Sequence, residues 1–144
     1  IKSSKIKPIK ASKEYYVKTT DEYPILTVLA ALTNGISIFK GIGDLANKES
    51  NRIKEMQKIL KQIGIKSIAT KNQIKIFGQE NMIIKNKKIK VPDLGDHRIF
   101  QSTAILSLIT GIPADMNKFE TVYTSAPSFL KIIKHLGGKF EIKK

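Results

Sequence analysis

The chain has 144 residues, and 26 Lys and Arg against 12 Asp and Glu give it a formal net charge of +14. This length suits one domain with a real core, and a hydrophobic content of 41% excludes the disordered and fibrous classes. The absence of cysteine excludes a disulfide scaffold, a thiolate zinc site and a cysteine nucleophile.

The first half of the chain shows helix and strand patterns in alternation. The first 18 residues are expected to hold a strand with an irregular lead-in. Pro24 suits the first turn of a helix that ends at Asn34-Gly35. The alternation at residues 36–39 predicts a strand, and a second helix is predicted over residues 48–63. A hairpin follows, with strands at residues 65–70 and 73–77.

The second half repeats this order after a Lys-rich connection at residues 85–90. A helix is predicted from Asp96 to about Thr110, where Gly111-Ile112-Pro113 ends it, and a short strand follows at residues 114–117. Another helix is predicted over residues 128–136, followed by a strand at 140–142. The helix at 128–136 is expected to turn four apolar side chains inward: Phe129, Ile132, Ile133 and Leu136.

The recurrence predicts two similar helix–strand–helix–strand units in tandem, at residues 1–78 and 79–144. Each unit opens with an acidic residue at a helix start, Asp21 in the first and Asp96 in the second. The implied fold class is α/β, with sheets packed on helices.

Asp21 is the first candidate for chemistry. A carboxylate at a helix start can cap free N–H groups and complement the helix dipole, and this role alone would explain the residue. The functional alternative is a rigidly held carboxylate that accepts a hydrogen bond or a proton from a substrate hydroxyl.

The segment at residues 48–52 is the second candidate. Lys48 and Arg52 are four residues apart, and on one helix they would share a face and repel each other unless an anion lay between them. A solvated face is the ordinary explanation for such charges. The functional alternative is an anion clamp beside Glu49 as a proton donor, although the surrounding cations favour the charged form of Glu49.

The segment at residues 95–98 is the third candidate. Free backbone N–H groups at the helix start, together with Arg98, can bind a phosphate or carboxylate. His97 can transfer protons, but a lone histidine is more often a packing or surface residue. Because His97 and His135 have no ligand partners at a suitable spacing, no metal site is expected.

The cationic residues divide into many lysines and two arginines. The lysines are scattered along the chain without interleaved aromatic residues, which makes a nucleic-acid partner improbable. The two arginines, Arg52 and Arg98, fall in the second and third candidate segments. This placement favours sites that need a planar guanidinium.

No long apolar stretch is present. The longest, residues 23–32, is too short to cross a bilayer, and the chain does not open with a signal-peptide pattern. We therefore expect a soluble, cytoplasmic protein without a membrane partner.

Four segments in this order resemble the C-terminal part of the 5-enolpyruvylshikimate-3-phosphate synthase (3-phosphoshikimate 1-carboxyvinyltransferase) family. They are Asp21-Glu22-Tyr23-Pro24-Ile25-Leu26, Lys48-Glu49-Ser50-Asn51-Arg52, Gly95-Asp96-His97-Arg98 and Thr124-Ser125-Ala126-Pro127-Ser128-Phe129. The resemblance covers nearly the whole chain, which corresponds to about a third of a full-length member. It implies repeated βαβαββ units of the enolpyruvyl transferase fold, with this chain supplying two of the three units of one domain.

The resemblance also implies a reaction. The family transfers the enolpyruvyl group of phosphoenolpyruvate to the 5-hydroxyl of shikimate 3-phosphate by addition and elimination, releases phosphate, and uses no metal or organic cofactor. Asp21 would hold and help to deprotonate the attacking hydroxyl, Lys48 would contact the hydroxyl region, and Glu49 would handle the methylene proton.

The remaining roles concern anion binding. Arg52 and Arg98 would bind phosphoenolpyruvate with His97 beside them. Thr124, which stands where some members carry a lysine, is expected in the substrate site. The family's N-terminal phosphate-binding segments are absent from this chain, so it is expected to need the missing N-terminal part as a partner and to be inactive alone.

Two further readings stay open on the sequence. One is the sister reaction, which transfers enolpyruvyl to UDP-N-acetylglucosamine. The other is a non-catalytic remnant that keeps the fold, or a basic module that binds anions or nucleic acid.

Overall fold

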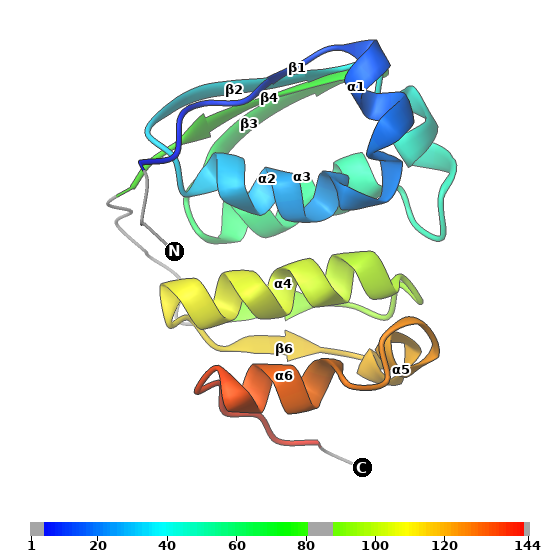
Figure 1. Ribbon diagram of the computed structural model, residues 1–144, viewed down its shortest axis with the longest axis vertical. Coiled ribbons are helices and arrows are strands. Elements are labelled where there is room, and N and C mark those ends of the chain that lie inside the picture. Colours follow the sequence, from blue (N-terminus) through cyan, green and yellow to red (C-terminus); the bar gives the residue numbers. More distant parts are fainter. Residues whose placement is uncertain (1–4, 81–87, 143–144) are drawn as a thin grey trace.

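The computed structural model describes residues 5–80 and 88–142, and its elements lie in layers (Figure 1). A four-stranded sheet covers one side of helices α2 (Tyr23–Ala31) and α3 (Arg52–Gln62). Helix α4 (His97–Thr110) lies on their other side. Strand β6 (Ala114–Met116) and helix α6 (Phe129–His135) follow beyond α4.

The larger sheet has the order β1-β2-β4-β3. Its strands are β1 (Lys10–Ala11), β2 (Gly35–Lys40), β3 (Lys66–Thr70) and β4 (Gln73–Gly78). Strand β1 pairs with β2 in parallel, and the other pairs are antiparallel. Phe39 lies opposite Ile74, and both point into the core, as the period of two requires. The predicted strand at residues 36–39 and the predicted hairpin are therefore confirmed.

Helix α2 forms where the sequence predicts it. Pro24 lies in its first turn, where a proline has no hydrogen bond to lose. Its inner face packs closely on the sheet, because a Cβ on Gly78 would stand 2.0 Å from the carbonyl oxygen of Ala30. Glycine is thus required at residue 78 for this approach of helix and strand.

Helix α3 begins later than predicted. The expected start was Lys48, but Asn51 is the N-cap, its side chain accepting a hydrogen bond from the N–H of Lys54, and the first helical residue is Arg52. Residues 43–47 form the short 3-10 helix η2 (Gly43–Asn47), and Lys48 follows it in extended backbone. Asn51 fixes the first residue of the helix, because an asparagine side chain caps a free N–H from a position just before the helix. Apolar periodicity alone does not locate this boundary.

The second half contains a parallel two-stranded sheet of β5 (Ile89–Val91) and β6. Helix α4 has Asp96 as N-cap and ends at Gly111, which has the left-handed backbone conformation that glycine adopts without strain. The predicted helix from Asp96 and the strand near residue 114 are confirmed. Strand β5 was not predicted, because Ile89 and Lys90 fall within the Lys-rich segment that was assigned as a connection. Residues 85–87 of that connection lie outside the described residues.

The C-terminal region departs from the prediction. Helix α6 turns Ile133 into the core with Phe129 packed against it, but Ile132 and Leu136 are 50% and 58% exposed. The predicted strand at residues 140–142 is wrong: the segment is irregular, and Phe140 and Ile142 are exposed. Apolar alternation favours a strand, but the backbone needs a neighbouring strand to pair with.

Several short helices complete the chain: α1 (Lys13–Lys18), 3-10 helix η1 (Thr20–Glu22), 3-10 helix η3 (Phe119–Thr121) and α5 (Val122–Ser125). Helix α1 contributes Tyr16 to an aromatic row in which the ring of Tyr23 lies between those of Tyr16 and Phe39. Within the described residues, none of the helices has the length and apolar character needed to span a bilayer.

Candidate functional site

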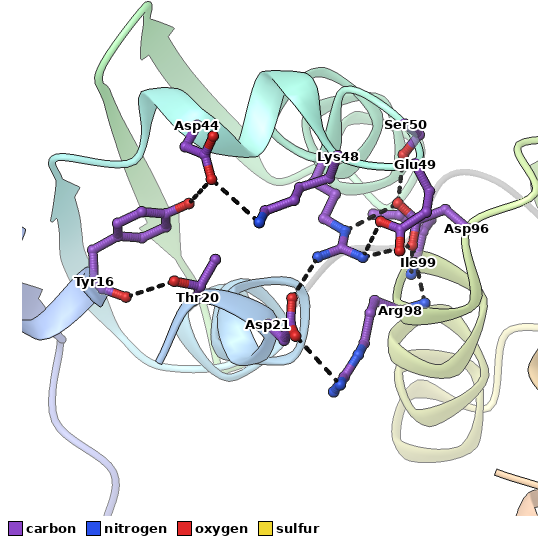
Figure 2. Close-up of polar contacts among 11 residues, drawn as sticks. Tyr16, Thr20, Asp21, Asp44, Lys48, Glu49, Ser50, Asp96, Arg98 and Ile99 are labelled. Carbon is purple, nitrogen blue, oxygen red and sulfur yellow. Dashed lines mark hydrogen bonds and ion pairs between the residues drawn. The ribbon is translucent and has the colours of Figure 1, made fainter. Parts of the chain in front are cut away.

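Three element starts meet in one place, and each brings charged side chains (Figure 2). Asp21 lies in η1 just before α2, Arg52 is the first residue of α3, and Asp96 caps α4. Arg52 and Asp96 are in contact although 44 residues separate them in the chain. The packing of α3 and α4 against α2 therefore gathers side chains that belong to three separate sequence motifs.

Arg52 is the centre of this cluster. Its side chain is 2% exposed, and its guanidinium donates to three carboxylates. Nε donates to Asp96 Oδ2 at 3.0 Å, Nη1 to Asp21 Oδ1 at 3.0 Å, and Nη2 to Glu49 Oε2 at 2.7 Å. A second bond from Nη2 reaches Asp96 Oδ1 at 3.3 Å. A guanidinium suits this position because its five N–H groups diverge in one plane.

Asp96 links the guanidinium to the backbone of α4. It is fully buried, and its Oδ1 accepts from the N–H of Arg98 at 3.0 Å and of Ile99 at 3.4 Å. Ser50 donates to its Oδ2 at 2.8 Å. Burial alone would raise the pKa of Asp96, but hydrogen bonds from Arg52 and Ser50 and the charge of Arg52 lower it below its usual value. Asp96 is thus an ionised carboxylate with every contact inside the protein.

Neither Asp96 nor Ser50 was among the predicted site residues. The sequence did carry a signal for Asp96, namely an acidic residue at a helix start, but that pattern indicates only a cap. Its partnership with Arg52 depends on how α3 and α4 pack.

Asp21 bridges the two arginines. Its Oδ1 accepts from Arg52, and its Oδ2 lies 3.6 Å from Nη2 of Arg98. The side chain of Asp21 is 50% exposed, so solvent reaches it. Among the described residues, the contacts of the Asp21 carboxylate are with the two arginines and not with the free N–H groups of a helix, so the simple capping role does not explain its position.

Arg98 is the more accessible of the two arginines. Its side chain is 36% exposed, compared with 2% for Arg52. Its Nε is buried and has no hydrogen-bond partner among the described residues. The accessible end of this guanidinium is suited to an anionic oxygen.

Lys48 lies at the edge of the cluster and does not share a helical face with Arg52. It precedes α3, so the predicted pairing of Lys48 and Arg52 at i and i+4 on one helix is wrong. Its Nζ instead lies 3.2 Å from Oδ2 of Asp44. The hydrogen bond to Asp44 is the main cause that raises the pKa of Lys48, with the charge of Asp21 adding to it.

Glu49 offers a carboxylate at the surface of the same cluster. Its side chain is 47% exposed and its Oε2 accepts from Arg52. Glu49 and Asp21 are thus two accessible carboxylates held by one buried guanidinium, an arrangement in which each can exchange a proton with a bound molecule.

Two predicted residues are not part of this network. His97 is the first residue of α4 and is partly buried beside Arg98, but its imidazole is not joined to the cluster by any hydrogen bond in the described chain. Thr124 lies in α5, where its hydroxyl donates to the carbonyl of Thr121 at 2.7 Å. In residues 5–80 and 88–142, no three His, Cys, Asp or Glu side chains are grouped as a metal ion would require.

Comparisons with known proteins agree with the motif order. A family model described as EPSP synthase (3-phosphoshikimate 1-carboxyvinyltransferase) matches residues 2–133. A 3-phosphoshikimate 1-carboxyvinyltransferase of Bacillus licheniformis is 34% identical over 96% of this chain and 32% of its own length. One from Zymomonas mobilis is 31% identical over 99% of this chain and 32% of its own.

The structure is similar to solved EPSP synthases as well. One from Acinetobacter baumannii superposes with a TM-score of 0.81 and 28% identity over 96% of this chain and 32% of that one. A second structure from the same organism gives a TM-score of 0.79 and 26% identity. These matches confirm the resemblance and the α/β enolpyruvyl transferase fold. The chain spans about a third of the length of the relatives it matches.

Proposed function

The chain belongs to the EPSP synthase family, and we propose that it supplies one part of a site that transfers enolpyruvyl from phosphoenolpyruvate to shikimate 3-phosphate. The observation that carries this proposal is the cluster around Arg52, in which Asp21, Glu49 and Arg98 meet. The remaining two thirds of the site-bearing enzyme would correspond to the N-terminal part of its relatives, which this chain does not match. The division into units at residues 1–78 and 79–144 stays a prediction.

Anion binding would fall mainly to Arg98. The exposed end of its guanidinium can donate N–H groups to the phosphate or carboxylate of phosphoenolpyruvate. Arg52 has less to offer, because four contacts to carboxylates leave one N–H, on Nη1. Arg52 would therefore contribute one donor and hold Asp21 and Glu49 in place. His97 and Thr124 would line the pocket from α4 and α5.

The addition step requires one proton to leave and one to arrive. The acceptor hydroxyl oxygen would attack C2 of phosphoenolpyruvate and pass its proton to Asp21, while Glu49 would give a proton to C3. Lys48 would stabilise the negative charge that develops on the attacking oxygen. Elimination would return the C3 proton to Glu49 and break the bond between C2 and the phosphate oxygen. The phosphate would leave with the proton that Asp21 took from the hydroxyl, which restores both carboxyl groups to their starting states.

The names of the relatives support shikimate 3-phosphate as the acceptor. The matching relatives cited above are named 3-phosphoshikimate 1-carboxyvinyltransferase, which favours shikimate 3-phosphate over UDP-N-acetylglucosamine. A non-catalytic remnant or a basic module is the alternative, and the measurement of phosphate release distinguishes it from the transferase.

The decisive experiment combines the chain with the N-terminal part of a relative and measures phosphate release from phosphoenolpyruvate and shikimate 3-phosphate. We expect release from the mixture and none from either part alone. In parallel, phosphoenolpyruvate is titrated into the labelled chain while backbone amides are followed by NMR. Shifts at residues 48–52 and 95–98 are expected.

The Arg98→Ala variant gives the specific control. Loss of a hydrogen bond to a charged group, about 1.5–3 kcal/mol, would weaken phosphoenolpyruvate binding roughly 10- to 150-fold. The matched control is Lys118→Ala, which removes an exposed cation paired with Asp93 outside the site and should leave binding unchanged. Spectra that do not change at millimolar phosphoenolpyruvate, together with a mixture that releases no phosphate, would refute the proposed function.

A further inference from the structure

A second polar network adjoins the Arg52 cluster and was not anticipated from the sequence. It consists of Tyr16 on α1, Asp44 in η2 and Lys48 just after η2 (Figure 2). The Tyr16 hydroxyl donates to Asp44 Oδ2 at 3.3 Å, and the same oxygen lies 3.2 Å from Lys48 Nζ. The carboxylate of Asp44 therefore joins a buried phenol to a lysine that faces the site.

The phenol is fixed by packing. Tyr16 is 7% exposed, and its ring meets that of Tyr23 edge to face, with the centroids 5.0 Å apart. Tyr23 in turn meets Phe39 of the sheet with centroids 5.4 Å apart. This aromatic row connects the hydroxyl of Tyr16 to the core, so its position is set before any ligand arrives.

The backbone around Asp44 is also fixed by its neighbours. Gly43, directly before Asp44, donates its N–H to Asn72 Oδ1 at 2.9 Å, and Leu45, directly after it, is buried. The Asp44 side chain itself is 60% exposed and would be free to rotate without the hydroxyl of Tyr16. Burial, and then the charge of Asp44, raise the pKa of Tyr16, so the hydroxyl stays a donor at neutral pH.

The lysine is the flexible member. A lysine side chain is a flexible chain of four methylene groups that ends in an ammonium with three N–H groups, so it keeps one orientation only when a partner holds it. Asp44 engages one N–H of Lys48, which leaves two for other partners. The titratable groups acting on it are the carboxylates of Asp44 and Asp21 and the phenol of Tyr16, and Figure 2 shows Nζ between Asp44 and Asp21.

From this geometry we infer that Tyr16 and Asp44 are positioning residues, which hold the Lys48 ammonium beside Asp21 where the acceptor hydroxyl would bind. Neither residue touches the reacting atoms: Tyr16 orients Asp44, and Asp44 orients Lys48. The inference rests on the proposed function for the role of Lys48. The two contacts themselves can be tested without turnover.

The first test observes Lys48 directly. The chain is prepared with ¹³Cε-labelled lysine, Lys48→Arg identifies the signal, and that signal is followed by NMR from neutral to alkaline pH. Asp44→Asn should lower the titration midpoint of Lys48, and Asp44→Glu should restore it. Tyr16→Phe keeps the carboxylate, so the midpoint should stay raised while the relaxation of the signal changes to that of a mobile lysine.

Two control variants match these changes. Asp93→Asn removes a carboxylate from another lysine pair, that with Lys118, and Tyr15→Phe removes the hydroxyl of the neighbouring, exposed tyrosine. Both should leave the Lys48 signal unchanged. A Lys48 signal that is the same in Asp44→Asn as in the unmodified chain would overturn the inference.

The second test asks whether positioning serves the reaction. In the mixture with the N-terminal part, Asp44→Asn should raise KM for shikimate 3-phosphate about tenfold, the effect of weakening one hydrogen bond to a charged group, with KM for phosphoenolpyruvate unchanged. If Asp44→Asn changes the Lys48 signal but leaves both KM values unchanged, the contact between Asp44 and Lys48 is only structural, and the positioning role in the reaction is overturned. If the unmodified mixture releases no phosphate, the proposed function fails, while the NMR test still decides the contacts.

Discussion

Replacing Asp96 tests the central ion pair most directly. The side chains of Asp96 and Arg52 are 0% and 2% exposed, so Asp96→Ala leaves a buried guanidinium without its principal partner. Removing one member of a buried pair costs about 3–5 kcal/mol. The lower end applies because Asp21 and Glu49 still contact Arg52. Loss of the α4 N-cap adds about 1 kcal/mol. The expected destabilisation is therefore about 4 kcal/mol.

Urea unfolding followed by far-ultraviolet circular dichroism measures this change, and thermal unfolding should show a decrease in Tm of roughly 10–16 °C. Asp96→Asn should cost about 1 kcal/mol less than Asp96→Ala, because an asparagine oxygen can still accept from the N–H groups of Arg98 and Ile99. It also gives a measurement if the alanine variant does not fold.

The matched control is Asp93→Ala. Asp93 lies 2.6 Å from the ammonium of Lys118, but both side chains are exposed, so the pair contributes at most about 1 kcal/mol. If Asp96→Ala and Asp93→Ala destabilise the protein equally, the buried guanidinium is not held by Asp96 and our account of the cluster is refuted.

Three further outcomes are expected. The pKa of Asp96 is lowered in the folded chain, so the stabilisation it provides is complete above its unfolded pKa of about 3.9 and is lost as the pH falls through the folded value. In acid titrations, the stability of Asp96→Asn should therefore decrease less steeply below pH 4 than that of the unmodified chain. Equal slopes for the two proteins would contradict this. Glu49→Gln should change the free energy of unfolding by less than about 1 kcal/mol, because its side chain is 47% exposed. It should nevertheless lower the rate of phosphate release by the mixture about 10²- to 10⁴-fold. A release rate close to that of the unmodified mixture would count against Glu49 as the proton donor. Gly78→Ala places a Cβ against backbone oxygens and should lower the free energy of unfolding by about 1–3 kcal/mol or more. Gly111→Ala meets no atom within 4 Å and should lower it by about 1 kcal/mol, because of the positive φ alone. Urea unfolding measures both changes.

The sequence by itself determined most of the regular structure. Helices α2 and α4, the hairpin of β3 and β4, and strand β2 follow from patterns that span a few residues: a proline in a first turn, an acidic cap, glycine after a last turn, alternating apolar side chains. These patterns act through neighbours in the chain, so they can be read without the fold. Motif order likewise identified the family, and it predicted that Asp21, Glu49, Arg52 and Arg98 belong to the site.

Tertiary structure decided what those residues do to one another. The pairing of Arg52 with Asp96 joins positions 44 residues apart, and Tyr16 meets Asp44 across 28. Whether a cation binds a ligand or a buried carboxylate depends on the groups that packing places around it, and no local pattern contains that information. The same reason explains the errors at α6 and at residues 140–142. Apolar periodicity marks a surface that can be covered, but only the neighbouring elements determine whether anything covers it.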